Sequence, residues 1–457
     1  MTTLTKIARA DLRGPHRVAP TMRQAAELAE FDGQPGSISS ADSGGEPNTQ
    51  VSTLIPSVGA RQAREAVLDH LCTSFALLLS LCGVASAAPP DPADSGGAAA
   101  AQPFSSMRLF DRIWGFATLY NDPDNPVLEK LAFRGRLQVD FPLFESNQGD
   151  YSEPQVRRLR LGLKSHWLAD LIVHVEVDID TTCDAGENCD DDAYEGLTDA
   201  YLGWAPSDAL ELKLGKMSAP FTLDGATSSR NLLTLERNNV SNNLWFPVEY
   251  HTGINASGRV EAWRYLGGVY SSSTTEEFGS LDGGVFMLLS LAHDFSRRLG
   301  VPESLLTLNY VFNEADEDNV STRELAHVVS LHFRFDTGAW GFRSDLSGGI
   351  GYGTQSDLIG LALVPFYHIT EKIQIVGRYT YLKSFGDNGV RFARYENRID
   401  PGRGDEYNEF FVGLNWFIYG HELKLQTGLK YTMMNDEAND GGDYRGWGWT
   451  TGLRISW

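Results

Sequence analysis

The sequence predicts an all-β fold: a transmembrane antiparallel β-barrel of about 16 strands over residues 130–457, with a long third external loop that folds inward. Segments of about ten residues alternate between apolar and polar side chains, as strands with one lipid face and one water face do. Short and long connections alternate between these segments. The last stretch, GWGWTTGLRISW, puts Trp447, Trp449 and Trp457 on one face and small or polar residues on the other.

Residues 61–88 have the three parts of a secretory signal peptide. RQAR supplies positive charge, LCTSFALLLSLCGVASA supplies an apolar stretch, and Ala85, Ser86 and Ala87 supply a small-residue cleavage site. Residues 1–60 are polar and lack periodicity, so we expect a disordered extension or a segment that precedes the true start of the protein. Residues 89–129 are expected to form a periplasmic linker.

The composition excludes several classes of function. No run of about 18 uncharged apolar residues follows residue 90, so no transmembrane helix is expected. The formal net charge of −22 argues against a nucleic-acid partner, because such proteins are usually basic. Histidines 166, 174, 327 and 332 occur singly on predicted strands, and no nucleotide-binding motif is present. We therefore expect no catalytic site, no enzyme activity and no cofactor.

Two cysteines, Cys183 and Cys189, lie in the acidic stretch TTCDAGENCDDD. In an oxidising compartment they could form a disulfide. The neighbouring carboxylates could instead bind Ca²⁺, although their spacing matches no known calcium loop. A solvated acidic surface loop is the third interpretation, and the residues leave all three open.

The alternation is clear from the first predicted strand onward. In LAFRGRLQVDF, Phe133 and Leu137 take one face, while Arg134 and Arg136 take the other. Helical spacing would scatter these side chains around an axis, so strands are favoured. The predicted strands lie near 130–141, 154–166, 168–179, 197–204, 208–216, 248–256, 259–270, 283–294, 304–314, 323–335, 338–350, 356–366, 370–383, 406–418, 421–434 and 446–457.

The connections show the asymmetry of an outer-membrane barrel, in which periplasmic turns are short and external loops are long. Short connections such as APSD and HIT alternate with long ones such as SSSTTEEFGSLD and the segment 217–247. Two links, SRRLGVPE and GTQ, depart from this rule. A β-sandwich has no reason to alternate its loops in this way.

Three stretches resemble the phosphate-selective porin family, the O and P type of outer-membrane channel: FRGRLQVD, LELKLGKMSAPFTLDGATSSRNLLTLERN and FFVGLNWFIYGHELKLQTGLKY. The resemblance covers most of residues 105–457. It implies a homotrimer of sixteen-stranded barrels in the outer membrane of a Gram-negative-type bacterium, in contact with its lipid. The implied function is passive diffusion of small anions such as phosphate or polyphosphate through a constriction lined by basic residues.

The resemblance places the constricting loop at 217–247, which contains Arg230 and Arg237. Strand alternation adds further basic residues that are expected to line the pore: Arg134, Arg136, Arg158, Arg160, Lys164, Lys213, Arg334 and Arg378. Such residues favour anions on a lumen wall. Asp140, Glu176, Asp178 and Glu211 share inward positions with them, so a general or sugar diffusion porin stays open as the alternative.

Overall fold

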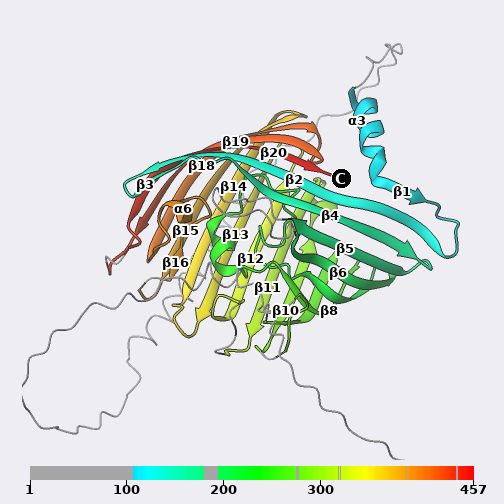
Figure 1. The fold of residues 1–457 in the computed structure, drawn as a ribbon, viewed down its shortest axis with the longest axis horizontal. Coiled ribbons are helices and arrows are strands. Elements are labelled where there is room, and N and C mark those ends of the chain that lie inside the picture. Colours follow the sequence, from blue (N-terminus) through cyan, green and yellow to red (C-terminus); the bar gives the residue numbers. More distant parts are fainter. Residues whose placement is uncertain are drawn as a thin grey trace, which may run out of the picture. The chain divides into compact units, whose positions relative to one another are not determined.

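The computed structural model describes residues 106–457, apart from 180–193, 274–276, 282, 317–318, 320, 388 and 439–440. Sixteen long strands in these residues form one antiparallel sheet (Figure 1). They are β2 (Leu128–Ser146), β4 (Gln155–Trp167), β5 (Leu171–Ile179), β6 (Tyr194–Ser207), β7 (Leu210–Ser218), β8 (Tyr250–Val260), β9 (Trp263–Ser271), β10 (Val285–Asp294), β11 (Glu303–Asn313), β12 (Leu325–Asp336), β13 (Trp340–Gly351), β14 (Leu358–Thr370), β15 (Ile373–Ser384), β18 (Glu406–Tyr419), β19 (Leu423–Asn435) and β20 (Tyr444–Ser456).

The sheet closes on itself. β2 pairs with β4 along one edge and with β20 along the other, where the register runs from Arg136↔Ser456 to Ser146↔Gly446. Closure pairs the backbone groups of the edge strands, which a barrel in lipid requires. The predicted barrel and its strand count are therefore confirmed, and each of the sixteen predicted strands overlaps one observed strand.

A short segment completes the seam between β2 and β20. It comprises α3 (Ser106–Trp114), η1 (Gly115–Ala117) and β1 (Thr118–Asn121). β1 pairs with β2 at Thr118↔Ala132 and Tyr120↔Leu131, beyond the part of β2 that β20 covers. This region was predicted only as a periplasmic linker, so its pairing with β2 was not expected.

Several minor elements lie in the long connections. β3 (Gly149–Tyr151) extends the hairpin that leads out of β2, and α5 (Ser296–Leu299) joins β10 to β11. The connection between β15 and β18 contains β16 (Val390–Arg391), α6 (Glu396–Ile399) and β17 (Arg403–Gly404). Among the described residues, no helix has the length and hydropathy needed to cross a bilayer.

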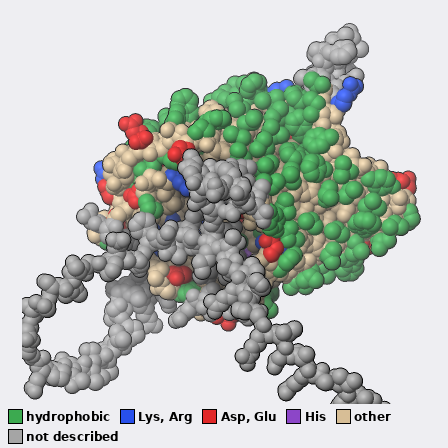
Figure 2. Space-filling model, viewed as in Figure 1, with side chains coloured by type: hydrophobic (Ala, Val, Ile, Leu, Met, Phe, Trp, Pro, Cys, Tyr) green, Lys and Arg blue, Asp and Glu red, His purple; other side chains and the backbone are tan. Residues whose placement is uncertain are grey.

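Apolar side chains cover the outside of the strands, where Figure 2 shows them gathered over the wall. Alternate residues within a strand differ sharply: Leu288 is fully buried, whereas its neighbours Met287 and Leu289 are 44% and 51% exposed. Trp447 and Trp449 are likewise about half exposed, on the outward face predicted for the last strand. A large exposed apolar band of this kind is the lipid-facing surface of a membrane barrel.

A second apolar cluster lies on the inner face of the wall. It is built around α4 (Asn239–Leu244), a helix in the connection between β7 and β8. Val240 and Leu244 of α4 join Leu288 of β10, Val328 of β12 and Leu358 of β14 in one buried cluster. Next to β10, β12 and β14, the barrel interior is therefore filled by α4.

Candidate functional site

The connection 219–249 between β7 and β8, here called the inner loop, crosses the lumen. Its backbone carbonyl groups accept hydrogen bonds from wall side chains on strands far from β7 and β8. These bonds join Lys424 Nζ to the Leu232 oxygen (2.7 Å), Asn415 Nδ2 to the Leu233 oxygen (2.8 Å) and Arg454 Nη2 to the Leu235 oxygen (3.1 Å). The donors lie on β19, β18 and β20, so the loop reaches the opposite wall.

Local interactions fix the shape of the inner loop. A Cβ at Gly225 would come within 2.2 Å of the Phe221 carbonyl oxygen, so only glycine allows this close backbone approach. Asn238 caps α4 by accepting a hydrogen bond from the Ser241 backbone nitrogen (2.9 Å). Asp224 Oδ2 accepts bonds from both the backbone and side-chain nitrogens of Asn238 (2.8 and 2.7 Å). These hydrogen bonds cap the N-terminus of α4 and join it to the preceding part of the loop at Asp224.

Two predicted pore residues, Arg136 and Arg160, are held by acids on β5. Arg136 Nη2 lies 2.8 Å from Glu176 Oε1, and its Nη1 donates to the Ser229 hydroxyl of the inner loop at 2.7 Å. Arg160 Nε donates to Asp178 Oδ2 at 2.8 Å. Both arginines are buried. The charge of each arginine is therefore balanced by a carboxylate on β5, and their role in lining the pore stays a prediction.

Arg158 and Arg237 share one acid, Glu249, at the end of the inner loop. Arg237 Nη1 lies 2.8 Å from Glu249 Oε1, and Arg158 Nη2 lies 3.5 Å from the same atom. Burial alone would raise the pKa of Glu249, but Arg237 and Arg158 outweigh it and hold the pKa well below its usual range. The Arg237 guanidinium also stacks over the Trp245 ring at 4.6 Å. Arg237 is therefore a fixed part of the loop.

On the far wall, Arg378 and Arg334 also bind the inner loop. Arg378 Nε lies 2.7 Å from Glu409 Oε1, and Arg378 Nη1 donates to Thr234 Oγ1 at 2.9 Å. Arg334 Nη2 donates to the Leu223 carbonyl oxygen at 3.3 Å. Both side chains donate hydrogen bonds to the inner loop, and these bonds hold the loop against the wall.

Two predicted cations face the lumen without an acidic partner. Arg134 and Lys164 form no ion pair or hydrogen bond within the described part of the chain, and both are partly exposed. They lie on neighbouring strands, because Lys164 is opposite Ala132 and Arg134 is opposite Gly162. Lys213 is nearby in the wall but lies 3.1 Å from Glu211 Oε2. Arg134 and Lys164 are thus the lumen cations most available to a solute.

Arg230 comes from the inner loop toward the same wall. Its Nη2 lies 3.7 Å from Glu176 Oε2, and its Nη1 donates to the Trp457 carbonyl oxygen at 3.1 Å. Burial, and then repulsion from Arg136 and Arg134, lower the pKa of Arg230 to about 10. Arg230 therefore stays charged at neutral pH and shares a site with Arg134.

A further group of arginines, which the sequence analysis missed, comes from the long connections. Arg323 precedes β12, Arg391 lies in β16 and Arg403 in β17; none of them makes an ion pair in the described residues. Burial, and then repulsion from Arg403, lower the pKa of Arg323 to about 10. Arg391 Nη1 donates to Gln355 Oε1 at 2.6 Å. These residues lie outside the sixteen strands of the barrel wall, so the alternation along those strands could not reveal them.

The apolar part of the lumen wall was not predicted either. Leu358, Ala362 and Val364 of β14 are buried on the inner face. The signal was present: LIGLALVPF is apolar at both parities, whereas a strand between lipid and water should alternate. A lumen face without polar residues requires a cover, which α4 supplies.

The remaining candidates do not form a site here. Cys183, Cys189 and the acidic residues around them lie outside the described residues. Among the described residues, no cluster of three or more histidine, cysteine or acidic side chains could hold a metal ion.

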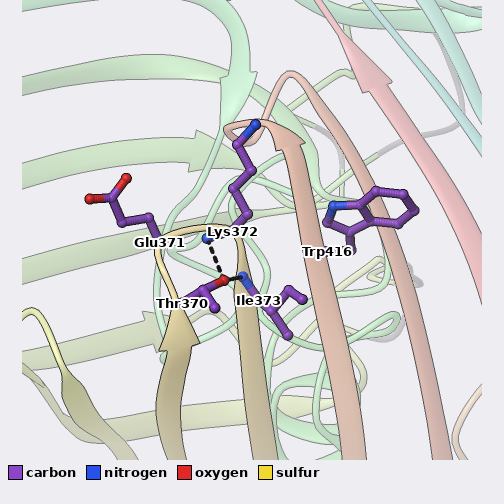
Figure 3. A pocket seen from close by; sticks show the side chains of 5 residues that line it. All are labelled: Thr370, Glu371, Lys372, Ile373 and Trp416. Carbon is purple, nitrogen blue, oxygen red and sulfur yellow. Dashed lines mark hydrogen bonds between the residues drawn. The ribbon is translucent and has the colours of Figure 1, made fainter. Parts of the chain in front are cut away.

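One shallow hollow of about 450 Å³ lies at the turn between β14 and β15 (Figure 3). It is lined by Thr370, Glu371, Lys372, Ile373 and Trp416. Thr370 Oγ1 accepts bonds from the backbone nitrogens of Lys372 and Ile373, which shapes the turn. Trp416 is about half exposed on the outer face, so this hollow is separate from the lumen charges.

Comparison with known proteins agrees with the barrel. Residues 131–284 match the family model "Phosphate-selective porin O and P". OmpF of Salmonella typhi, in complex with daunomycin, has a similar fold: the TM-score is 0.52 at 11% identity, covering 74% of this chain and 100% of OmpF. No curated protein gives a significant match.

Two further solved structures are similar at lower scores. OprB of Pseudomonas putida has 9% identity and a TM-score of 0.49, covering 72% of this chain and 94% of OprB. OmpT of Vibrio cholerae, in a trimer form, has 10% identity and a TM-score of 0.46, covering 72% of this chain and 99% of OmpT. The family match and the barrel fold suggest a channel rather than an enzyme. The closed sixteen-stranded barrel, its apolar outer band and the family match over residues 131–284 indicate an outer-membrane porin of a Gram-negative bacterium, whose likeness to the phosphate-selective O and P type is confined to the matched residues.

Proposed function

We propose that this porin carries small anionic solutes, such as phosphate or polyphosphate, by passive diffusion. The observation that carries the proposal is the distribution of unpaired charge on the lumen face. Arg134 and Lys164 have no acidic partner in the described residues, whereas the inward acids Glu176, Asp178 and Glu409 each have an arginine within 2.8 Å. Asp199, opposite Glu176, differs from these acids, because its one ion-pair partner within the described residues is His174 at 3.9 Å. Two free cations beside arginine-paired acids still favour anions at this part of the wall.

The three arginines of the long connections support the same proposal. Arg323, Arg391 and Arg403 crowd together without an ion pair in the described residues, and each is only partly exposed. Burial, and then repulsion from Arg323 and Arg403, hold the pKa of Arg391 well below its usual value. An anion would relieve this repulsion, since guanidinium groups offer several donors to phosphate oxygens.

The alternative is a general or sugar diffusion porin of the same architecture. It is favoured by the pairing of Arg136, Arg158 and Arg160 with acids, because a neutralised constriction discriminates weakly between charges. The homotrimer and the lipid contacts stay predictions that follow from the family resemblance.

Uptake into liposomes that contain the purified protein separates the two functions. We expect labelled phosphate to enter faster than a neutral sugar of similar size. The difference should shrink at high salt, because ions screen the potential of exposed charges over about 10 Å at 0.1 M. Equal rates for both solutes at low salt would support the general diffusion porin instead.

A further inference from the structure

Residues 106–121, here called the N-terminal segment, are anchored to the barrel by specific contacts. The Trp114 indole nitrogen donates to the Ser456 carbonyl oxygen at 2.7 Å. The Phe110 ring stacks on Tyr419 with 5.4 Å between ring centroids, and the Tyr419 hydroxyl donates to Asp111 Oδ1 at 2.6 Å. The segment therefore has a defined position at the end of the barrel where β18 and β20 end, at Tyr419 and Ser456.

These contacts are on the outer face of the wall. The Phe116 ring lies 6.2 Å from Phe133 and 5.9 Å from Trp457. Phe133 points outward, because its neighbour Arg134 has the parity of the lumen-facing residues of β2. The Trp457 ring covers Gly135, which has the same outward parity, since a Cβ there would come within 2.4 Å of the ring. The segment thus lies on the side of the barrel that faces lipid.

Large apolar side chains of the segment are left uncovered by the barrel. Leu109, Ile113, Phe116 and Leu119 are 59%, 46%, 50% and 54% exposed. Leu109 and Ile113 are four residues apart, so they share one side of α3, while Phe110 and Trp114 turn toward the barrel. This exposed stripe continues the apolar surface that Phe133 and Trp457 present, and that surface meets lipid in an outer-membrane protein.

The backbone of the segment supports the same placement. β1 pairs with β2 at Ala132 and Leu131, on the edge that β20 leaves open below Arg136. An unpaired strand edge in the hydrocarbon region would leave amide groups without hydrogen-bond partners, which lipid cannot supply. β1 and β20 thus pair with two successive parts of the same edge of β2.

We propose that the N-terminal segment is an interfacial element that lies in the periplasmic leaflet of the outer membrane. Its partner is phospholipid: Leu109, Ile113, Phe116 and Leu119 contact acyl chains, and β1 seals the seam beside β2. Arg112, which is exposed between the two sides of α3, is positioned to reach lipid phosphate groups. This role is independent of the solute that the porin carries.

Nitroxide labels test the placement in the full chain, with its cysteines replaced by serine, in phospholipid vesicles. Leu109→Cys and Ile113→Cys label the apolar stripe, and both positions are exposed, so neither label disturbs packing. Asp124→Cys, in the exposed turn before β2, is the matched control. We expect oxygen, which concentrates in lipid, to relax the labels at 109 and 113 more than a water-soluble nickel complex does, with the reverse order at 124.

Two outcomes would overturn the proposal. Nickel accessibility at 109 and 113 equal to that at 124 would place α3 in the aqueous periplasm. Exclusion of both reagents, together with dipolar broadening between labels, would mean that a second copy of the chain covers this face. Neither result depends on anion transport, so the proposed function would be unaffected.

Discussion

At the residue scale, the lumen arginines hold the inner loop in place. Arg136 joins Glu176 of the wall to Ser229 of the loop, and Arg378 joins Glu409 to Thr234 in the same way. Each side chain thus bridges a strand acid and a loop oxygen. Because these donors are used internally, the number of basic residues in the lumen overstates the positive charge that a solute meets.

The Arg378–Glu409 pair gives a prediction about stability. Both side chains are buried, at 4% and 0% exposure, so Arg378→Met would leave the Glu409 charge without its arginine. We expect this change to lower the free energy of unfolding by about 3–5 kcal/mol, as when one partner of a buried ion pair is removed. Adding Glu409→Gln should restore much of the loss. Urea unfolding in detergent measures both, and a double variant no more stable than the single one would contradict the account.

The pairing of these charges could not be predicted from the sequence. Strand alternation places Arg136 and Glu176 on the lumen face correctly, but it does not give the register between β2, β4 and β5. The register brings Arg136 beside Arg160 and Glu176 beside Gly162, which allows the long arginine to reach the acid across the strand between them. The contacts with the inner loop also depend on the tertiary fold, so they could not be predicted from the sequence either.

At the element scale, the strands were predictable because lipid and water impose a period of two on each of them. The exception is β14, whose inner face is apolar. It packs under α4, where Val240 fills the space above Gly360: a Cβ on that glycine would come within 2.9 Å of Val240. The pattern of apolar residues within β14 does not show which other segment of the chain covers its inner face.

The docking of α4 leads to a prediction about the inner loop. Val240 is fully buried, so Val240→Asp places an unpaired charge in an apolar cluster, at a cost of about 2–7 kcal/mol or more. We expect the loop to undock while the barrel stays closed, so that trypsin cleaves after Arg230 and Arg237 at least about ten times faster.

Asn231→Asp is the control for this experiment, because it adds the same charge to an exposed position of the same loop. It should leave the cleavage rate unchanged. A protected loop in Val240→Asp, or equal cleavage in both variants, would show that α4 does not hold the loop against the wall.

At the scale of the whole molecule, the barrel interior is asymmetric. Lys164 and Lys213, on β4 and β7, are partly exposed, whereas Lys424 and Gln426 on β19 are buried under the inner loop. The open part of the lumen therefore runs along β4 to β7. Lys164 lies in this part of the wall, and Arg134 lies on the neighbouring strand β2, so the two free cations line one side of the accessible route.

The reversal potential of the purified porin in a planar bilayer, under a KCl gradient, tests this central claim most directly. The account predicts a preference for chloride over potassium, which Arg134→Gln with Lys164→Gln reduces. Lys372→Gln, at the exposed turn between β14 and β15 (Figure 3), removes a charge away from the lumen and should change nothing. A preference for potassium, or a shift as large in Lys372→Gln as in the lumen variant, would contradict the account.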